Sequence, residues 1–354
     1  MSKIQKKGVS GIMRIRNEKD FIEPCIESCI SVLDELVIVY NDCTDGSEEV
    51  IERIRMEYPD KIKVFNYPYK VLGVGLTKEE YEYAKSLPAD SPQLLCNYYN
   101  FALSKVSYQY AIKIDADQMY FSDVLEEYCD LCREDAHRFR KSHIYLGKLF
   151  QSYLSLFRYL SMRSNKLLPF MPNWLGKYAA TYYKAYAKKL FIDGKACLSF
   201  SGINVVEDKG DTYVCMGLKS DEFNILPPFN GEGDHVLFKV SEDTYYQPFD
   251  MSYYKKLRNT TYSLIEIFIH PYRIMPVGFA WLHINAQRKE YINRVLEVKK
   301  RRPEAFVKIA DFLKSGYNQI LRQTDPAMFN HFQRVLFAYV YKAYGHTIVK
   351  HIQK

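Results

Sequence analysis

The feature that most constrains the fold is an alternation of short apolar runs with amphipathic segments over residues 9–120. Unbroken apolar runs of strand length are typical of parallel strands that are buried on both faces. The pattern therefore predicts an α/β fold, with a mostly parallel sheet flanked by helices. The expected strands are Val9–Ile15, Glu35–Tyr40, Lys61–Phe65 and Tyr110–Ile114.

Helices are expected between these strands. After Asn17–Asp20, apolar residues recur every four positions from Phe21 to Leu33, which predicts one buried helix face. Ser47 can cap a second helix, and residues 93–106 predict a third. The stretch 67–92 is expected to be irregular.

Two carboxylates, Asp115 and Asp117, follow the last of these strands with one residue between them. In an extended backbone, residues i and i+2 point to the same side, so both oxygen donors would lie together at the carboxyl end of a buried strand. Ligands bind at that end in α/β proteins, and paired hard oxygens suit Mg²⁺ or Mn²⁺. A solvated acidic turn is the alternative for an isolated Asp-x-Asp.

Three motifs follow the expected strands in order: Arg16-Asn17-Glu18, Leu36–Ser47 and Ile114–Asp117. Together they resemble GT-A-fold glycosyltransferases, most closely family 2, the bacterial inverting enzymes of surface-polysaccharide and lipooligosaccharide assembly. In the second motif Asn41 replaces an aspartate of the family, and Cys43-Thr44 replaces Gly-Ser.

The resemblance implies a nucleotide-sugar donor, expected to be a UDP-sugar, and Mn²⁺ or Mg²⁺. By this resemblance Asp115 lies near the ribose or the metal, and Asp117 binds the metal that bridges the diphosphate. The metal offsets the charge that grows on the departing diphosphate. The other donor-binding candidates are Arg14, Asn17, Asn41, Asp42 and Arg288.

The acceptor's proton requires a base. Asp234 is the favoured residue and Glu232 the second choice, because both lie in a glycine-containing stretch, residues 228–235, where the family carries a later acidic motif. Asp234 as a cap of a helix-like run at 235–238 is the structural alternative.

His283 is expected to complete the metal shell. In residues 281–285 the alternation places His283 on one face with the apolar residues on the other, and the family implies a late histidine ligand. A hydrogen-bonded structural histidine is the alternative. Arg288 or Lys289 just beyond is expected to meet the diphosphate.

Residues 136–192 are basic and aromatic. They hold eleven Lys and Arg and no Asp or Glu, so the rest of the chain carries −4 of the total +7. A helical insertion with a solvated basic side is expected, and so is a surface for an anionic membrane or an anionic lipid-linked glycan. Aromatic and basic residues together also suit nucleic acid, but no such motif accompanies them. Scattered cysteines and the lack of a signal core or spanning run predict a cytoplasmic protein, peripheral on the inner face of the membrane.

The expected organisation has four parts: a nucleotide-sugar half (1–135), the basic aromatic insertion (136–192), an acceptor-side half (193–287) and a helical C-terminal region (288–354). Within the last part, helices are expected at 290–302, 304–315 and 326–344. The expected function is sugar transfer to a cell-surface glycan or lipid-linked acceptor, as in lipopolysaccharide or capsule synthesis. A sugar-nucleotide pyrophosphorylase and a non-catalytic basic peripheral membrane protein are the alternatives. The first would normally show a glycine-rich phosphate loop, and residues 9–16 lack one.

Overall fold

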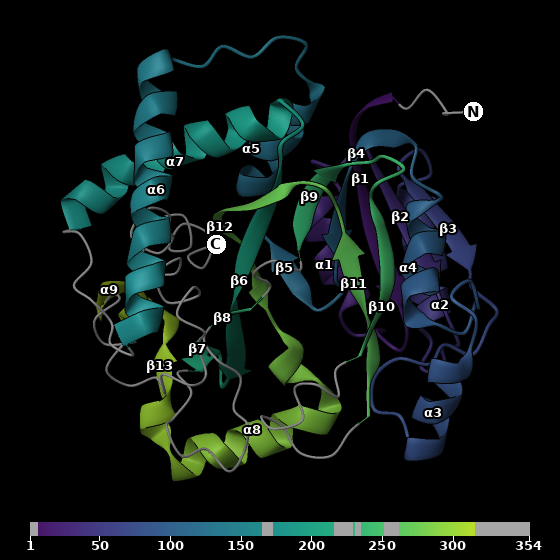
Figure 1. Cartoon of the computed structure of the whole chain (residues 1–354). Helices are drawn as coiled ribbons and strands as arrows, with labels where there is room; N and C mark the ends of the chain where they lie inside the picture. Colours follow the sequence, from purple (N-terminus) through teal and green to yellow (C-terminus); the bar gives the residue numbers. More distant parts are fainter. Residues whose placement is uncertain (1–5, 165–172, 216–228, 231–234, 251–261, 316–354) are drawn as a thin grey trace. The chain divides into compact units, whose positions relative to one another are not determined.

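The computed structural model describes residues 6–164, 173–215, 229–230, 235–250 and 262–315 (Figure 1). The chain divides into two compact units. The first unit combines residues 1–116 with 237–272, and the second combines 117–236 with 273–354. The boundary passes between Ala116 and Asp117, so the two aspartates of the Asp-x-Asp motif belong to different units.

A parallel sheet forms the first unit. Its strands are β1 (Lys6–Ile15), β2 (Glu35–Tyr40), β3 (Ile62–Asn66), β4 (Tyr108–Ile114) and β9 (Val236–Lys239). Strand β1 pairs in parallel with β2 and with β4, and β3 pairs in parallel with β2. Strand β9 runs antiparallel beside β4. The predicted α/β fold with mostly parallel strands is confirmed, and β2 has the bounds that its apolar run predicts.

Helices and a strand pair complete the first unit. They are α1 (Ile22–Cys29), α2 (Ser47–Glu57), α3 (Lys78–Ser86), α4 (Leu95–Leu103) and the antiparallel pair β10 (Tyr245–Asp250) and β11 (Leu264–Ile269). Helix α1 buries the predicted face, including Cys25 and Cys29. Helix α4 contacts β1 on one side and β10 and β11 on the other, so it is enclosed within this unit.

Three local expectations are wrong. Residues 67–92 are not irregular throughout, because α3 lies among them and is capped by reciprocal hydrogen bonds between Thr77 and Glu80. The run 235–238 is not helix-like but enters strand β9, which extends the sheet. The expected helix 304–315 begins instead with the strand β13 (Phe306–Lys308), and α9 (Ile309–Ser315) follows it.

The second unit is built around a long strand, β6 (Ala196–Asp208). Strand β12 (Arg273–His283) pairs with it in parallel, β7 (Asp211–Cys215) and β8 (Phe229–Asn230) pair with it antiparallel, and β13 pairs with β7. The short strand β5 (Gln118–Tyr120) runs antiparallel to β12. Helices α5 (Ser122–Arg133) and α8 (Lys289–Arg301) belong to the same unit.

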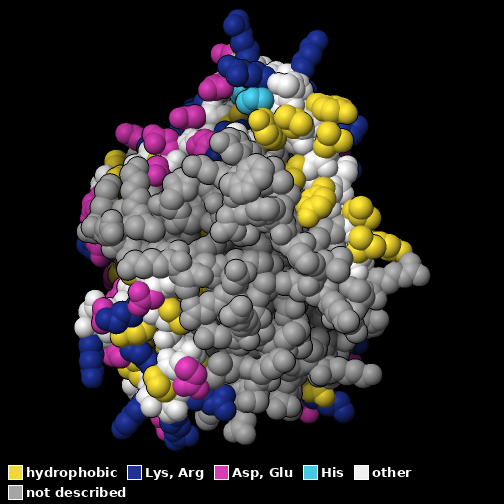
Figure 2. Space-filling model, turned by 90° about the vertical axis from the view of Figure 1, so that its left-hand side faces the viewer, with side chains coloured by type: hydrophobic (Ala, Val, Ile, Leu, Met, Phe, Trp, Pro, Cys, Tyr) yellow, Lys and Arg dark blue, Asp and Glu magenta, His cyan; other side chains and the backbone are white. Residues whose placement is uncertain are grey.

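The basic segment contains two helices, α6 (Lys141–Ser164) and α7 (Asn173–Ile192), as its helical spacing predicts. That residues 136–192 are an insertion into the fold stays a prediction. They approach closely at Gly147, where an added Cβ would lie 2.2 Å from the carbonyl oxygen of Tyr182. Glu127 of α5 binds α7 through Lys184 and Lys188, the latter at 2.6 Å. In Figure 2 hydrophobic side chains gather at the upper right, where α6 lies.

Among the described residues, no helix combines the length and apolarity needed to cross a membrane. Helix α8 agrees with the expected C-terminal helix 290–302 to within a residue at each end. The expected helix 326–344 lies outside the described residues.

Candidate functional site

Three of the predicted motifs follow strands that end at one edge of the first unit's sheet. Ile15 at the end of β1 lies opposite Tyr40 at the end of β2, and Met13 lies opposite Ile114 at the end of β4. The loops that carry Asn17, Asn41 and Asp115 therefore begin side by side. The strand register therefore places the three loops at the carboxyl edge of the sheet, where ligands bind in α/β proteins.

The loop after β2 is held by side chains of the loop after β1. The Oδ1 of Asn17 accepts a hydrogen bond from the backbone N–H of Thr44 at 2.7 Å. Asn17 and Asp42 both adopt positive φ angles, 58° and 48°, which asparagine and aspartate tolerate better than most residues. Asp42 is exposed and pairs with Arg16 at 3.1 Å, so the predicted donor residue faces solvent in this structure.

Asn41 is buried, and its amide orientation is fixed by its partners. Its Nδ2 donates to the carbonyl oxygens of Tyr67 at 2.6 Å and Tyr69 at 2.7 Å. A flipped amide would place an oxygen against two carbonyl oxygens, so the assignment of N and O is secure. Among the described residues the Oδ1 of Asn41 has no hydrogen-bond partner. A buried acceptor without a donor loses free energy, which is regained if a ligand donates to it.

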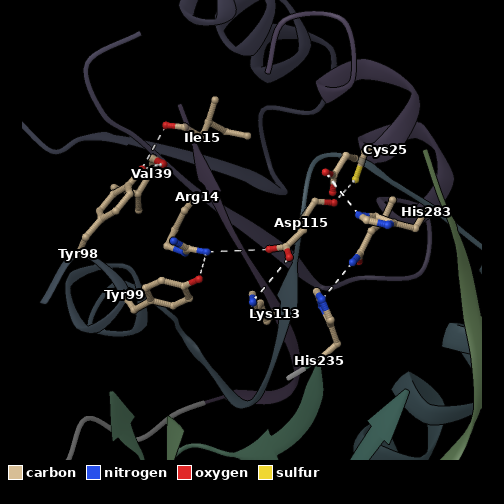
Figure 3. Close-up of polar contacts among 12 residues, drawn as sticks. Arg14, Ile15, Cys25, Val39, Tyr98, Tyr99, Lys113, Asp115, His235 and His283 are labelled. Atoms are coloured by element: carbon tan, nitrogen blue, oxygen red, sulfur yellow. Dashed lines mark hydrogen bonds and ion pairs between the residues drawn. The ribbon is translucent and has the colours of Figure 1, made fainter. Parts of the chain in front are cut away.

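Asp115 lies between two cations in the first unit (Figure 3). Its Oδ1 is 4.0 Å from Nη2 of Arg14, and its Oδ2 is 3.6 Å from Nζ of Lys113. Arg14 also donates to the hydroxyl oxygen of Tyr99 and packs against its ring. Burial raises the pKa of Tyr99, so its hydroxyl stays neutral beside these charges.

The backbone of the Asp-x-Asp motif departs from the expectation of an extended strand. Strand β4 ends at Ile114, and Ala116 and Asp117 form a turn before β5. The prediction that Asp115 and Asp117 point to the same side assumed an extended backbone, and that assumption is wrong. The turn occurs because Asp117 accepts, through its carbonyl oxygen, a hydrogen bond of 2.9 Å from the N–H of Ile284 just after β12.

Asp117 meets two predicted residues in the second unit. Its Oδ2 lies 2.9 Å from Nη2 of Arg288 and 3.5 Å from Nε2 of His283. The three side chains are largely buried, with 12%, 20% and 11% of their surfaces exposed. Burial raises the pKa of Asp117, but His283 and Arg288 lower it more, and the pKa lies well below its ordinary value. The group is therefore a carboxylate at neutral pH.

Strand pairing places the imidazole of His283. His283 lies opposite Gln118 of β5 and opposite Asn204 of β6. Its Nδ1 is 2.5 Å from Oδ1 of Asn204, which accepts and so fixes the proton on Nδ1. The Nε2 of the same ring lies 3.5 Å from Oδ2 of Asp117. An imidazole nitrogen beside a carboxylate oxygen is a pair of ligand atoms that fits a divalent cation.

Sequence reasoning missed several residues at these two clusters. Asn204 carried no signal, because its role appears only once β6 and β12 are known to pair. Tyr99 and Lys113 were also missed, although Lys113 stands two residues before Asp115 in the same strand and is 6% exposed. The signal that could have identified Lys113 is the presence of a lysine in an otherwise apolar strand.

Two other predictions are not settled by the described residues. Asp234 and Glu232 lie outside them. Within the described ranges, no group of three or more His, Cys, Asp and Glu is placed to hold a metal ion. Asp117 and His283 are a pair, and the assignment of Asp115 as a further ligand stays a prediction.

Comparison with known protein families finds a match in the N-terminal part of the chain. A family model described as beta-1,4-N-acetylgalactosaminyltransferase (CgtA) matches residues 6–158, which include both aspartates of the Asp-x-Asp motif. Residues 6–158 are therefore similar to a glycosyltransferase family. The resemblance found in the motifs is thereby confirmed. No curated protein matches the sequence.

Solved structures resemble about a third of this chain, and only weakly. TarS from S. aureus in complex with UDP-GlcNAc is 18% identical, with a TM-score of 0.26, and the match covers 35% of this chain and 30% of that one. Glucosyl-3-phosphoglycerate synthase from Mycobacterium tuberculosis, with Mn²⁺, UDP and phosphoglyceric acid, is 20% identical, with a TM-score of 0.21 and coverage of 32% and 34%. This chain thus spans about a third of those proteins. The fold assignment rests on strand order and the family model, because TM-scores of this size add nothing to it.

Proposed function

We propose that the protein is a metal-dependent, inverting glycosyltransferase that moves a sugar from a UDP donor to a cell-surface glycan or lipid-linked acceptor at the cytoplasmic face of the membrane. The observation that carries the proposal is the buried contact of Asp117 with His283 and Arg288 in a chain whose N-terminal part matches a glycosyltransferase family. A carboxylate and an imidazole can hold a divalent metal, and a guanidinium can bind the oxygens of a diphosphate.

Asp117 and His283 are proposed to hold Mn²⁺ or Mg²⁺, with Asp115 as a further candidate ligand. When bound, the metal would offset the negative charge that develops on the departing diphosphate. Arg288 already contacts Asp117, and it is proposed to turn its planar fork to the diphosphate oxygens.

The nucleoside part of the donor is proposed to lie along the loops after β1, β2 and β4. The buried Oδ1 of Asn41 can accept a hydrogen bond from a base N–H, which uracil supplies. Asp115 is proposed to accept from the ribose hydroxyls, while Arg14 and Lys113 keep it in place electrostatically. Asn17 is proposed to act through the loop that it fixes, and Asp42 through its exposed carboxylate.

Asp234 is proposed to remove the proton of the acceptor hydroxyl, with Glu232 as the second choice. The proposal rests on their sequence context alone. Asp234→Asn should abolish transfer while donor affinity is kept, since the amide cannot accept the proton. Near-normal turnover in Asp234→Asn together with loss in Glu232→Gln would assign the base to Glu232.

The donor sugar is proposed to be an N-acetylhexosamine, because the matching family model describes a beta-1,4-N-acetylgalactosaminyltransferase. The test is release of UDP from a panel that contains UDP-GalNAc, UDP-GlcNAc and UDP-glucose, with Mn²⁺ and with chelator. UDP release that depends on metal and on acceptor supports the proposal. Synthesis or cleavage of UDP-sugar with pyrophosphate would show a pyrophosphorylase instead, and no turnover of any donor would favour a binding protein.

A further inference from the structure

Helix α6 carries a row of large apolar side chains in contact with solvent. Leu149 and Leu156 are 50% and 56% exposed, and Tyr145 is 64% exposed. At 3.6 residues per turn and 1.5 Å per residue, the row occupies an arc of about 140° and a length of about 22 Å. Its members are Tyr145, Leu146, Leu149, Tyr153, Leu156, Tyr159 and Leu160.

The opposite side of α6 is the side that packs within the second unit. Gly147 lies against the backbone of Tyr182 in α7, and the ring of Phe150 contacts Tyr183 at 6.1 Å between centroids. Both positions fall outside the apolar arc. The row is therefore not the seam of the helical pair, because that seam lies on another face, and Figure 2 shows hydrophobic side chains on the outer surface there.

The charged side chains of the segment that carries the row have one sign, because residues 136–192 contain no Asp or Glu. Lys141 and Lys148 are exposed and lie beside one edge of the arc at helical spacing, and Arg138 and Arg140 are exposed just before α6. Two copies of this face would bring like charges together, which disfavours self-association. An apolar row edged by cations is instead complementary to a bilayer with anionic headgroups.

We propose that α6 is an interfacial membrane helix. Its apolar row enters the boundary between headgroups and acyl chains of an anionic bilayer, and Lys141 and Lys148 meet the lipid phosphates. The helix lies in the plane of the membrane. The membrane contact would hold the enzyme where a lipid-linked acceptor is embedded. Only this purpose rests on the proposed function; the binding itself does not. Vesicle binding is measured without donor or acceptor, so its failure and a failure of transfer are separate results.

The test is co-sedimentation of the full chain with vesicles of phosphatidylglycerol and phosphatidylethanolamine, compared with vesicles of phosphatidylcholine. The wild type should bind the anionic vesicles and should be released by high salt. The double variant Leu149→Ser/Leu156→Ser should bind at least about tenfold more weakly, because two partly inserted leucines are lost. Lys148→Gln should bind about fivefold more weakly. The matched control is Met56→Ser on α2, a side chain that is 69% exposed in the first unit and should leave binding unchanged.

Insertion itself is measured with a tryptophan at the row. The emission of Leu156→Trp should shift to shorter wavelength with anionic vesicles and should be quenched by brominated acyl chains. Met56→Trp should show neither effect. Because these positions are exposed, the thermal unfolding midpoints of all the variants should match that of the wild type, which separates loss of binding from loss of fold.

Three results would overturn the proposal. One is vesicle binding by Leu149→Ser/Leu156→Ser at the wild-type level. Another is equal binding of the wild type to phosphatidylcholine and anionic vesicles at low salt. The third is a dimer in sedimentation velocity that the double variant dissociates while the wild type ignores vesicles, since a second copy would then be the occupant of the row.

Discussion

Asp115 and Asp117 are separated by one residue, but they occupy different environments. Asp115 follows a parallel strand of the first unit, its side chain is 30% exposed, and Arg14 and Lys113 attract it from 4.0 and 3.6 Å. Asp117 belongs to the second unit, is 12% exposed, and is hydrogen-bonded to Arg288 at 2.9 Å. A motif that the sequence presents as one acidic pair is thus two carboxylates with separate supports. We expect the more buried one to matter more for transfer.

The largest effect is expected for Asp117→Asn. An amide binds a divalent metal far less well than a carboxylate and leaves Arg288 without its ion pair, so UDP release should fall about 10³-fold. Steady-state UDP release with saturating Mn²⁺ is the measurement. Asp60→Asn is the matched control, because Asp60 is exposed after α2. Turnover within a few-fold of wild type would show that Asp117 is not a metal ligand and that the more buried aspartate is not the more important one.

His283→Ala is expected to lower Mn²⁺ affinity at least about tenfold, since even groups that only support metal ligands have effects of this size. Isothermal titration with Mn²⁺ in the presence of UDP reports the affinity directly. His137→Ala is the control, because that histidine pairs with Glu134 before α6. An unchanged affinity in His283→Ala would leave its bond with Asn204 as a structural contact only.

A smaller effect is expected for Asp115→Asn. The loss of a charged acceptor for a ribose hydroxyl should weaken UDP binding about tenfold and should appear mainly in the KM for the donor. Arg14→Gln should weaken UDP binding to a similar extent, because Asp115 would then lose one of the two cations that keep it in place. A loss in kcat as large as that of Asp117→Asn would show that the two aspartates act as one metal-binding pair after all.

The smallest effect on transfer is expected for Glu127→Gln, which serves as a reference. Glu127, like Asp115, is flanked by two cations, Lys184 and Lys188, but it lies on α5 and has no expected role in transfer. The substitution should leave kcat unchanged and lower the free energy of unfolding by about 1 kcal/mol, because the pairs are partly exposed and screened. A fall in kcat would show that the anchoring of α7 affects the site.

Glu127→Gln also allows a prediction of how the stability of the protein depends on pH. Burial raises the pKa of Glu127, but the two lysines lower it more, so folding lowers it below its ordinary value of about 4.5. A carboxyl of this kind adds stability above its unfolded pKa and loses it as the pH falls through the folded pKa. Urea unfolding should therefore show a difference between wild type and Glu127→Gln at pH 7 that shrinks below about pH 4. A difference that grows on acidification would contradict the assignment.

Local patterns predicted the strands and their edge well. The unbroken apolar run of β2 placed both of its ends, and three loop motifs identified the edge where polar side chains gather. Helix α3 was not predicted, since it buries only Tyr81 and Ala84 and so shows little periodicity, although the spacing of Thr77 and Glu80 is that of a capping box.

Contacts between remote segments could not be predicted. The position of His283 beside Asp117 depends on the pairing of β5 with β12, and its proton position depends on Asn204 in β6. Nothing in the local sequence of either strand states which strand it will join. The turn at Asp117 has the same origin, because a backbone hydrogen bond from Ile284 draws the chain away from the extended path.

The amide of Asn41 bears on attempts to engineer this chain toward the consensus of the family that it resembles. An aspartate in its place would direct a carboxylate oxygen at two backbone carbonyls, turning two attractive contacts into repulsions inside the protein. Substitution by the commoner residue is usually a safe route to thermostability. At this position it should lower the melting temperature instead, unless the chain from Tyr67 to Tyr69 is redesigned with it.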